Sequence, residues 1–241
     1  MTPLPPGLQD NRLLALLDAG TLQALAPALE PFPLPPRITL WREQEPMAHA
    51  YFPVEGVLSV LCSGSAAEPS IEVATIGREG VLGVPLVLGA ELSPNLVFAQ
   101  VAGAAWRMEA EAFRAAVRSL PALAQVLHRY TQALMVQMSQ GTACNRLHPA
   151  LQRCARWLLQ THDRVRGDAF DLTQDFLAQM VGERRATVNQ VAGELQQQGL
   201  IRYTRGRIVV TDRAGLEATA CPCYRKVRLE YARMLGEGAL D

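Results

Sequence analysis

Residues 172–210 have the sequence LTQDFLAQMVGERRATVNQVAGELQQQGLIRYTRGRIVV, and this stretch decides the fold of the C-terminal part of the chain. Thr173 can cap the N-terminus of a first short helix, and Gly182 supplies the turn that ends it. A second helix follows and stops at Gly199, a natural C-terminal cap. Two short helices joined by a glycine-containing turn predict a helix-turn-helix.

The second helix of this pair has one apolar face and one polar face. Val188, Val191 and Leu195 are spaced three and four residues apart, so they should face the core. The N-terminal half, which enters the major groove in helix-turn-helix proteins, is rich in side chains that can bond base edges. At the start of the first helix, Thr173 and Gln174 can hold a phosphate. The side chains of the second helix that we predict to contact DNA are Arg184, Arg185, Thr187, Asn189 and Gln190.

Residues 200–210 predict a β-hairpin after the second helix. Two β-rich runs flank Arg205–Gly206–Arg207, so both arginines should lie at the tip, beside a DNA backbone. The alternative is an arginine-rich helix and hairpin that are merely solvated. A helix, a glycine turn, an arginine-rich helix and a basic hairpin occur here in the order of a winged helix-turn-helix. This order favours a domain that binds double-stranded DNA.

The first half of the chain has the pattern of a compact antiparallel β-roll or sandwich. Short helices are expected over 10–30, ended by the proline-rich stretch 31–36. Four β-rich runs follow, separated by Gly, Pro, Asn and acidic turns. The predicted fold class is therefore α+β. The four runs are 37–46, 50–62, 70–89 and 96–108.

A long helix with a hinge at its end is expected over 119–145. Apolar side chains three or four residues apart form one stripe along about six turns. Val126 and Met135 widen this stripe, so the helix can pack on its own domain and on a partner helix. We predict a dimerisation helix, and packing on the chain's own β-roll is the alternative. The predicted dimer stripe consists of Leu120, Leu123, Leu127, Tyr130, Leu134 and Met138.

Composition and charge describe a folded protein with a basic C-terminal part. Its 241 residues suffice for two domains, and 49% are hydrophobic against 19% charged. Residues 1–145 carry 8 Arg and 12 acidic residues, a balance of −4, whereas residues 146–241 carry 15 basic and 11 acidic residues, a balance of +4. A basic domain suits a polyanionic partner. There is no run of 18 apolar residues, no secretory leader, and an odd number of cysteines (five), so we expect a cytoplasmic protein without a membrane span or disulfide framework.

The stretch LTQDFLAQMVGERRATVNQVAGELQQQGLIRYTRGRIVVTDRAGLE, residues 172–217, strongly resembles the C-terminal domain of Crp/Fnr transcription regulators. The preceding β-rich region and long helix are similar to the sensor domain and dimer helix of that family. The resemblance implies a homodimeric, sequence-specific transcription regulator that works with RNA polymerase. Arg185–Ala186 stands where the cAMP-dependent member has an Arg–Glu pair, so that member's target sequence is not carried over. The implied parts are a cyclic-nucleotide-binding-like β-roll at 1–118, a dimerisation helix and hinge at 119–145, a winged helix-turn-helix at 146–220 and a C-terminal extension at 221–241.

The expected sensor domain lacks the groups that known effectors of this family need. Cyclic AMP requires a carboxylate and an arginine, but Val84 stands at the carboxylate position and residues 84–105 contain no Arg or Lys. Because an unpaired buried phosphate is costly, cAMP is not expected to bind. An iron–sulfur cluster is not expected, since the first 61 residues hold no cysteine, and haem is not expected either. We therefore predict no cofactor and leave the effector open. The weak candidates for an axial haem ligand are His49, Cys62 and His128.

The motif Cys221–Pro222–Cys223–Tyr224 is not explained by any of the predicted domains. Two thiols this close can bind a soft metal or oxidise, with Cys154 or a cysteine of a partner chain as further candidates. The interpretation that we favour is exposed or packed thiols in a C-terminal extension, although the motif resembles a Cys-x-Cys-Tyr tail of one Crp/Fnr subgroup. No catalytic arrangement surrounds the four histidines, so an enzyme is not expected. The alternative function is a sensing or protein-interaction module whose helix-turn-helix does not bind DNA.

Overall fold

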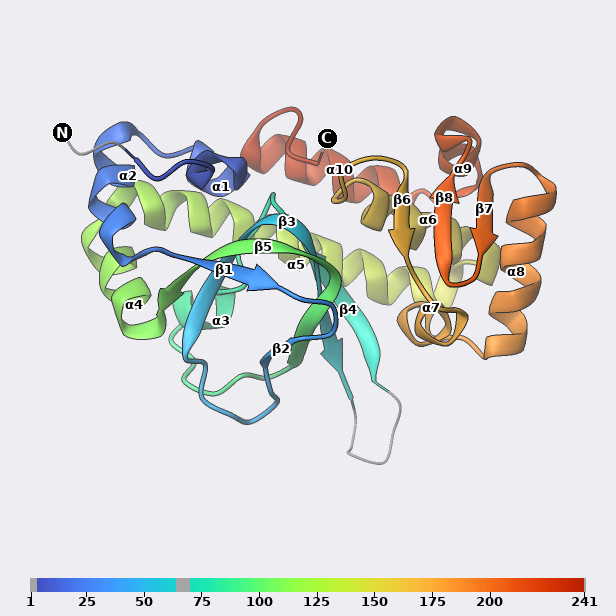
Figure 1. Cartoon of the computed structure of the whole chain (residues 1–241), viewed down its shortest axis with the longest axis horizontal. Helices are drawn as coiled ribbons and strands as arrows, with labels where there is room; N and C mark the ends of the chain where they lie inside the picture. The colour runs from blue at the N-terminus through green and yellow to red at the C-terminus, as the bar shows by residue number, and fades with distance from the viewer. Residues whose placement is uncertain (1–3, 64–69, 241) are drawn as a thin grey trace.

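The computed structural model describes residues 4–63 and 70–240 (Figure 1). Helices and antiparallel strands are both present, so the predicted α+β class is confirmed. Across the described ranges, no helix has the length and apolar character needed to cross a bilayer. The domain ranges predicted above also include residues outside the described part, namely 1–3, 64–69 and 241.

Four short helices precede the sheet, as predicted for residues 10–30. Asn11 fixes them on the β-roll: its side-chain oxygen accepts a hydrogen bond from Leu14 N, and its amide donates to the carbonyl oxygens of Pro53 and Gly80. Such a cap satisfies a helix N-terminus and anchors it at the same time. The helices are η1 (Leu8–Asp10), α1 (Arg12–Ala15), α2 (Ala19–Leu25) and η2 (Ala26–Ala28).

A five-stranded antiparallel sheet forms the roll, in the order β1–β5–β3–β4 with β2 paired to β5. The proline-rich stretch 31–36, expected only to end the first helices, supplies strand β1. Pro31 and Pro33 are tolerated there because β1 lies at the edge of the sheet, where a missing N–H removes no ladder bond. The elements are β1 (Glu30–Leu34), β2 (Thr39–Trp41), β3 (His49–Cys62), β4 (Ile71–Ile76), the short helix α3 (Val84–Val87) and β5 (Leu96–Glu109).

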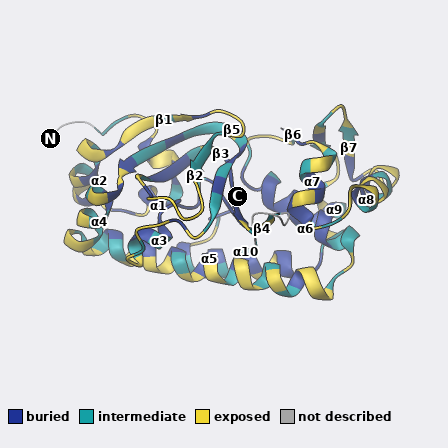
Figure 2. Ribbon diagram, turned by 90° about the horizontal axis from the view of Figure 1, so that it is seen from below, coloured by how far each residue is buried: buried dark blue, intermediate teal, exposed yellow. Residues whose placement is uncertain are grey.

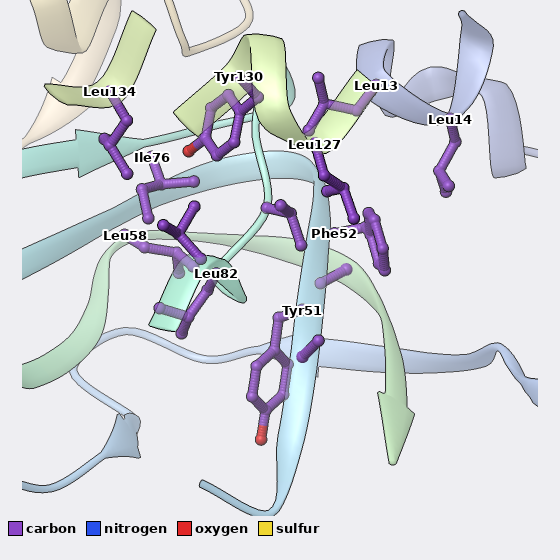
Figure 3. Close-up of a cluster of buried hydrophobic side chains, with 14 of the residues drawn as sticks. Leu13, Leu14, Tyr51, Phe52, Leu58, Ile76, Leu82, Leu127, Tyr130 and Leu134 are labelled. Atoms are coloured by element: carbon purple, nitrogen blue, oxygen red, sulfur yellow. The ribbon is translucent and has the colours of Figure 1, made fainter. Parts of the chain in front are cut away.

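Helix α5 (Pro121–Leu147) follows α4 (Ala110–Ser119) and runs alongside both the roll and the C-terminal unit (Figure 1 and Figure 2). Its 27 residues correspond to about 40 Å. The inner face of α5 packs into the roll, where Leu127, Tyr130 and Leu134 lie over side chains of β3 and β4 (Figure 3). The helix therefore closes the core of the β-roll.

The structure corrects the predicted dimer stripe. Leu120 lies just before α5 and packs on the core of the roll. Among the six predicted side chains, only Met138 is exposed. Packing on the chain's own β-roll, the alternative interpretation, holds for the others, because spacing identifies a buried face without identifying what covers it. The side chains that fill the chain's own core, each at most 8% exposed, are Leu123, Leu127, Tyr130 and Leu134.

The C-terminal unit has its own core, built around Trp157, Leu177, Leu195 and Ile208. Its three short strands pair in the order β6–β8–β7. The elements are α6 (Ala150–His162), β6 (Ala169–Asp171), α7 (Gln174–Val181), α8 (Arg185–Gln197), β7 (Ile201–Thr204), β8 (Arg207–Val210) and α9 (Arg213–Thr219).

The last helix, α10 (Cys223–Leu235), returns from this unit to α5. Val227, Tyr231 and Leu235 are buried in the core of the roll, and the Tyr231 ring lies 6.4 Å from that of Tyr130, edge to face. The predicted C-terminal extension is thus a structural part of the N-terminal core.

Candidate nucleic-acid interface

The helix-turn-helix forms as its capping residues predict. Thr173 Oγ1 accepts a hydrogen bond from Phe176 N at 3.3 Å and begins α7. Gly182 ends α7 in the left-handed region, with φ of 69°, where glycine is favoured. Arg184 is the N-cap of α8, which begins at Arg185, three residues after Gly182.

The apolar side of α8 holds this helix in place. Val188, Val191 and Leu195 are buried, which confirms the predicted inner face. They pack in one core with Leu177 of α7 and Ile208 of β8. Because this side is fixed, the opposite side of the first two turns is presented to solvent in one orientation.

All nine residues predicted to contact DNA have accessible side chains. Arg185 Nε lies 3.2 Å from Asp175 Oδ1, and Gln190 Nε2 donates to Glu194 Oε1 at 3.1 Å. Both contacts are at the surface, so phosphates or bases can replace them at little cost. Gln174 and Thr187 are half-buried, and the exposed residues are Thr173, Arg184, Arg185, Asn189, Gln190, Arg205 and Arg207.

The wing is a tight hairpin attached to the start of α7. Arg205 and Gly206 both have positive φ, 49° and 79°, as a two-residue hairpin turn requires. Tyr203 Oη donates to Leu172 O at 2.8 Å, and Leu172 N donates to Gly206 O at 2.6 Å. Figure 1 shows the hairpin tip, α7 and the start of α8 at the same end of the unit.

One buried ion pair and two further hydrogen bonds join this unit to the roll and α5. Arg164 Nε donates to Glu79 Oε1 at 2.8 Å, and both side chains are 1% exposed. Trp157 Nε1 of α6 donates to Glu72 Oε1 of β4 at 2.5 Å. Arg164 also donates to Gln137 Oε1 of α5 at 3.3 Å. The C-terminal unit is thus attached to the roll and α5 through specific polar contacts.

A cavity of 230 Å³ lies between the roll and α5. Val84, predicted above to stand at the carboxylate position of cAMP-binding relatives, is part of its wall. Among the described residues that line it, none is charged, and the polar side chains are those of Ser93, Asn95 and Thr131. The wall is otherwise apolar, so it offers no cation to a phosphate group.

Four potential metal ligands come together at the other end of α5. Cys144 in the last turn of α5 and His148 after it meet Cys221 and Cys223, and one donor atom from each residue lies within 4.8 Å of the other three. The prediction of no cofactor is therefore wrong, because it assumed that the chain has no complete ligand set, whereas these four residues can hold a metal ion. The favoured interpretation of Cys221 and Cys223 as thiols of an extension missed Cys144 as their neighbour.

The thiols of this group interact directly. Cys144 Sγ lies 3.2 Å from Cys221 Sγ, and Cys223 Sγ lies 3.7 Å from His148 Nδ1. The hydrogen bond from Cys221 lowers the pKa of Cys144 to about 5, and the same bond raises the pKa of Cys221. Cys154, proposed above as a further ligand, lies in the core of the C-terminal unit, where burial raises the pKa of its thiol to about 12. It is not part of the group.

A comparison with protein-family models finds a match, which lies within the C-terminal unit. The Crp-like helix-turn-helix domain matches residues 152–219. No sequence among the curated proteins matches the chain.

Solved structures of the same fold cover most of the chain. FixK2 from Bradyrhizobium japonicum aligns with a TM-score of 0.68 and 16% identity, over 80% of this chain and 98% of FixK2. A transcriptional regulator assigned to the Crp/Fnr family from Eubacterium rectale aligns with a TM-score of 0.67 and 14% identity, over 86% of this chain and 96% of that regulator. A Crp/Fnr regulator from Thermus thermophilus aligns with a TM-score of 0.64 and 20% identity, over 79% of this chain and 98% of that regulator. At these identities the alignments show a shared fold, which is the fold that the resemblance predicted.

Proposed function

We propose that this chain, which carries a Crp-like helix-turn-helix domain on the fold of Crp/Fnr regulators, is a sequence-specific transcription regulator that binds double-stranded DNA as a homodimer. The observation that carries the proposal is the polar start of α8, held by a buried apolar side and lying beside an arginine-tipped wing. In this proposal the protein works in the cytoplasm with RNA polymerase and has no catalytic activity.

The start of α8 supplies the chemistry for base recognition. Arg185 can bond guanine O6 and N7 in pairs, and Asn189 or Gln190 can do the same to adenine. Arg205 and Arg207 lie on the wing, where they would neutralise backbone phosphates. Thr173 lies at the start of α7, a suitable place to hold a phosphate.

The exposed side of α5 is our proposed dimer surface. Met135 and Met138 are 58% and 37% exposed, although the buried side of the same helix is filled by the roll. Leu88, which is 69% exposed, and Met135 both line the cavity between the roll and α5, so an apolar strip extends from α5 toward the roll. A strip of this kind on a long helix suits a second copy of the same helix.

Arg185→Ala tests the proposal, with Arg225→Ala on α10 as the control for loss of an exposed arginine. Loss of one bidentate contact should weaken operator binding by about 1–3 kcal/mol and relax specificity at one base pair. The measurement is selection of bound genomic fragments followed by titration of the best fragment. Operator affinity equal to wild type in Arg185→Ala would contradict the assigned reading surface. If wild-type protein shifts no genomic fragment at low salt, the protein-interaction module becomes the better hypothesis.

A further inference from the structure

The four-residue group of Cys144, His148, Cys221 and Cys223 occupies a particular place in the fold. Cys144 and His148 precede the DNA-binding unit in the chain, and Cys221 and Cys223 follow it. The group therefore lies where both ends of that unit join α5 and α10. Its position is independent of whether the unit binds DNA.

Local structure brings each pair of ligands together. His148 N donates to Cys144 O at 3.1 Å as the cap of α5, so their side chains lie one helical turn apart. Pro222 is the N-cap of α10, and Tyr224 N donates to Cys221 O at 3.1 Å, which turns both thiols of the Cys-Pro-Cys motif toward α5. Two turns of the chain thus present two ligands each.

The distances suit one tetrahedral metal ion. A zinc ion with Zn–S bonds near 2.3 Å separates neighbouring thiolate sulfurs by about 3.8 Å. The sulfurs of Cys144 and Cys221 are 3.2 Å apart, Cys223 Sγ and His148 Nδ1 are 3.7 Å apart, and the largest separation within the group is 4.8 Å. Side-chain movements of about 1 Å bring all four donor atoms to such positions.

Burial and charge favour a metal over free thiols. Cys144, Cys221 and Cys223 are all at most 4% exposed, and they form a cluster of their own outside the two larger cores. Arg156 of α6 lies beside Cys144. Three thiolates and one neutral histidine leave a Zn²⁺ complex with a single negative charge, which this arginine can balance.

We propose that Cys144, His148, Cys221 and Cys223 form a Cys₃His site for one divalent metal ion of the zinc type, which fastens both ends of the DNA-binding unit to α5. A disulfide between Cys144 and Cys221 would use two of the ligands and leave Cys223 and His148 without a function. With all four positions filled by protein, the site is structural rather than catalytic. Because it connects residues 77 positions apart, it restricts the chain at the junction of the two units.

Metal analysis of protein purified without oxygen and without chelators is the first test. We expect about one zinc ion per chain, and Co²⁺ substitution should produce the intense visible bands of tetrahedral cobalt with thiolate-to-metal charge transfer. Cys221→Ser and Cys144→Ser should lose the metal, whereas the control variants Cys62→Ser and Cys154→Ser should keep it. X-ray absorption of the wild-type zinc protein should show sulfur neighbours near 2.3 Å and one nitrogen near 2.0 Å, and this measurement does not depend on how the variants fold.

Several results would overturn the proposal. These are wild-type protein without bound metal, a shell of oxygen and nitrogen only, a Cys144–Cys221 disulfide in protein kept reduced, or labile sulfide with the absorption of an iron–sulfur cluster. Retention of zinc in both Cys221→Ser and Cys144→Ser would place the ion elsewhere. Hydrogen exchange tests the fastening: residues 144–150 and 220–226 should exchange faster after zinc is removed by a chelator, and equal exchange would contradict it.

Discussion

Replacing Glu72 with glutamine should remove a loss of stability that wild-type protein shows as the pH rises toward 8. The Glu72 carboxyl group lies between the roll and α6, where it accepts hydrogen bonds from Ser59 Oγ at 2.6 Å and Trp157 Nε1 at 2.5 Å. Burial raises its pKa from 4.5 to about 7, although these bonds and the charges of Arg156 and Arg164 act in the opposite direction. The folded protein thus keeps a proton there that the unfolded chain releases.

The sign of the effect follows from this difference in bound protons. Between pH 4.5 and about 7 the folded state binds more protons than the unfolded state, so the free energy of unfolding falls as the pH rises. The contribution is complete below pH 4.5 and is lost once the pH passes about 7. A shift of about 2.5 pKa units corresponds to about 3 kcal/mol at 1.36 kcal/mol per unit, and partial solvent access to the residue reduces this to about 2 kcal/mol.

Glu72→Gln preserves the shape of the side chain and the oxygen that accepts from Trp157 Nε1. Its amide NH₂ can donate to Ser59 Oγ, which keeps its own bond to Gln100 Oε1, and the side chain cannot ionise. Its free energy of unfolding should match that of wild type near pH 5 and exceed it by about 2 kcal/mol at pH 8. Urea unfolding at several pH values, followed by tryptophan fluorescence, measures this difference. Glu91→Gln, at an exposed position, is the matched control and should follow wild type throughout. The reasoning fails if Glu72→Gln keeps the wild-type pH dependence or is less stable than wild type at pH 8.

Three further predictions concern the wing, the buried ion pair and the dimer. The double variant Arg205→Ala/Arg207→Ala should weaken DNA binding similarly for all sequences and reduce the slope of log K against log salt by about 2, as measured by fluorescence anisotropy; an unchanged slope would place these arginines away from phosphates. Arg164→Met should cost about 3–5 kcal/mol in urea unfolding because it leaves the Glu79 carboxylate buried and unpaired, and Arg164→Met/Glu79→Leu should recover most of that loss; a double variant no better than the single one would refute this account. Met135→Glu should produce monomers in size-exclusion chromatography with light scattering, while Leu229→Glu on α10, an equally exposed apolar side chain, should not; a dimer that survives Met135→Glu must use another surface.

The helix-turn-helix and the wing were predictable because their signals are local. Thr173 as a cap, Gly182 in the left-handed region and the Arg205–Gly206 turn each depend on a few neighbouring residues. The alternation of buried and exposed positions in α8 follows from helical spacing alone. These features therefore form as the sequence predicts, and they lie within residues 152–219, which match the Crp-like helix-turn-helix domain.

The features that the sequence did not reveal depend on distant partners. Pro31 and Pro33 form a strand only because a neighbouring strand leaves them at an edge. The approach of Cys144 to Cys221 joins positions 77 residues apart, and no local pattern encodes it. Two signals could have suggested this site. One is the Cys-Pro-Cys motif itself, and the other is His148, which follows Cys144 by four residues, about one helical turn. Both lay in the sequence, but only the return of α10 to α5 connects them.

Helix α5 is the element on which these separate features meet. Leu134, Met135 and Met138 line the cavity against the roll, and Met135 and Met138 also belong to the proposed dimer surface. On another side of the same helix, Gln137 accepts a hydrogen bond from Arg164, and the final turn carries Cys144. Because a packed interior has little free volume, a ligand larger than the 230 Å³ cavity would have to displace α5. Such a displacement would act on the proposed dimer surface and on both attachments of the C-terminal unit, so this one helix would connect the cavity to the position of α8.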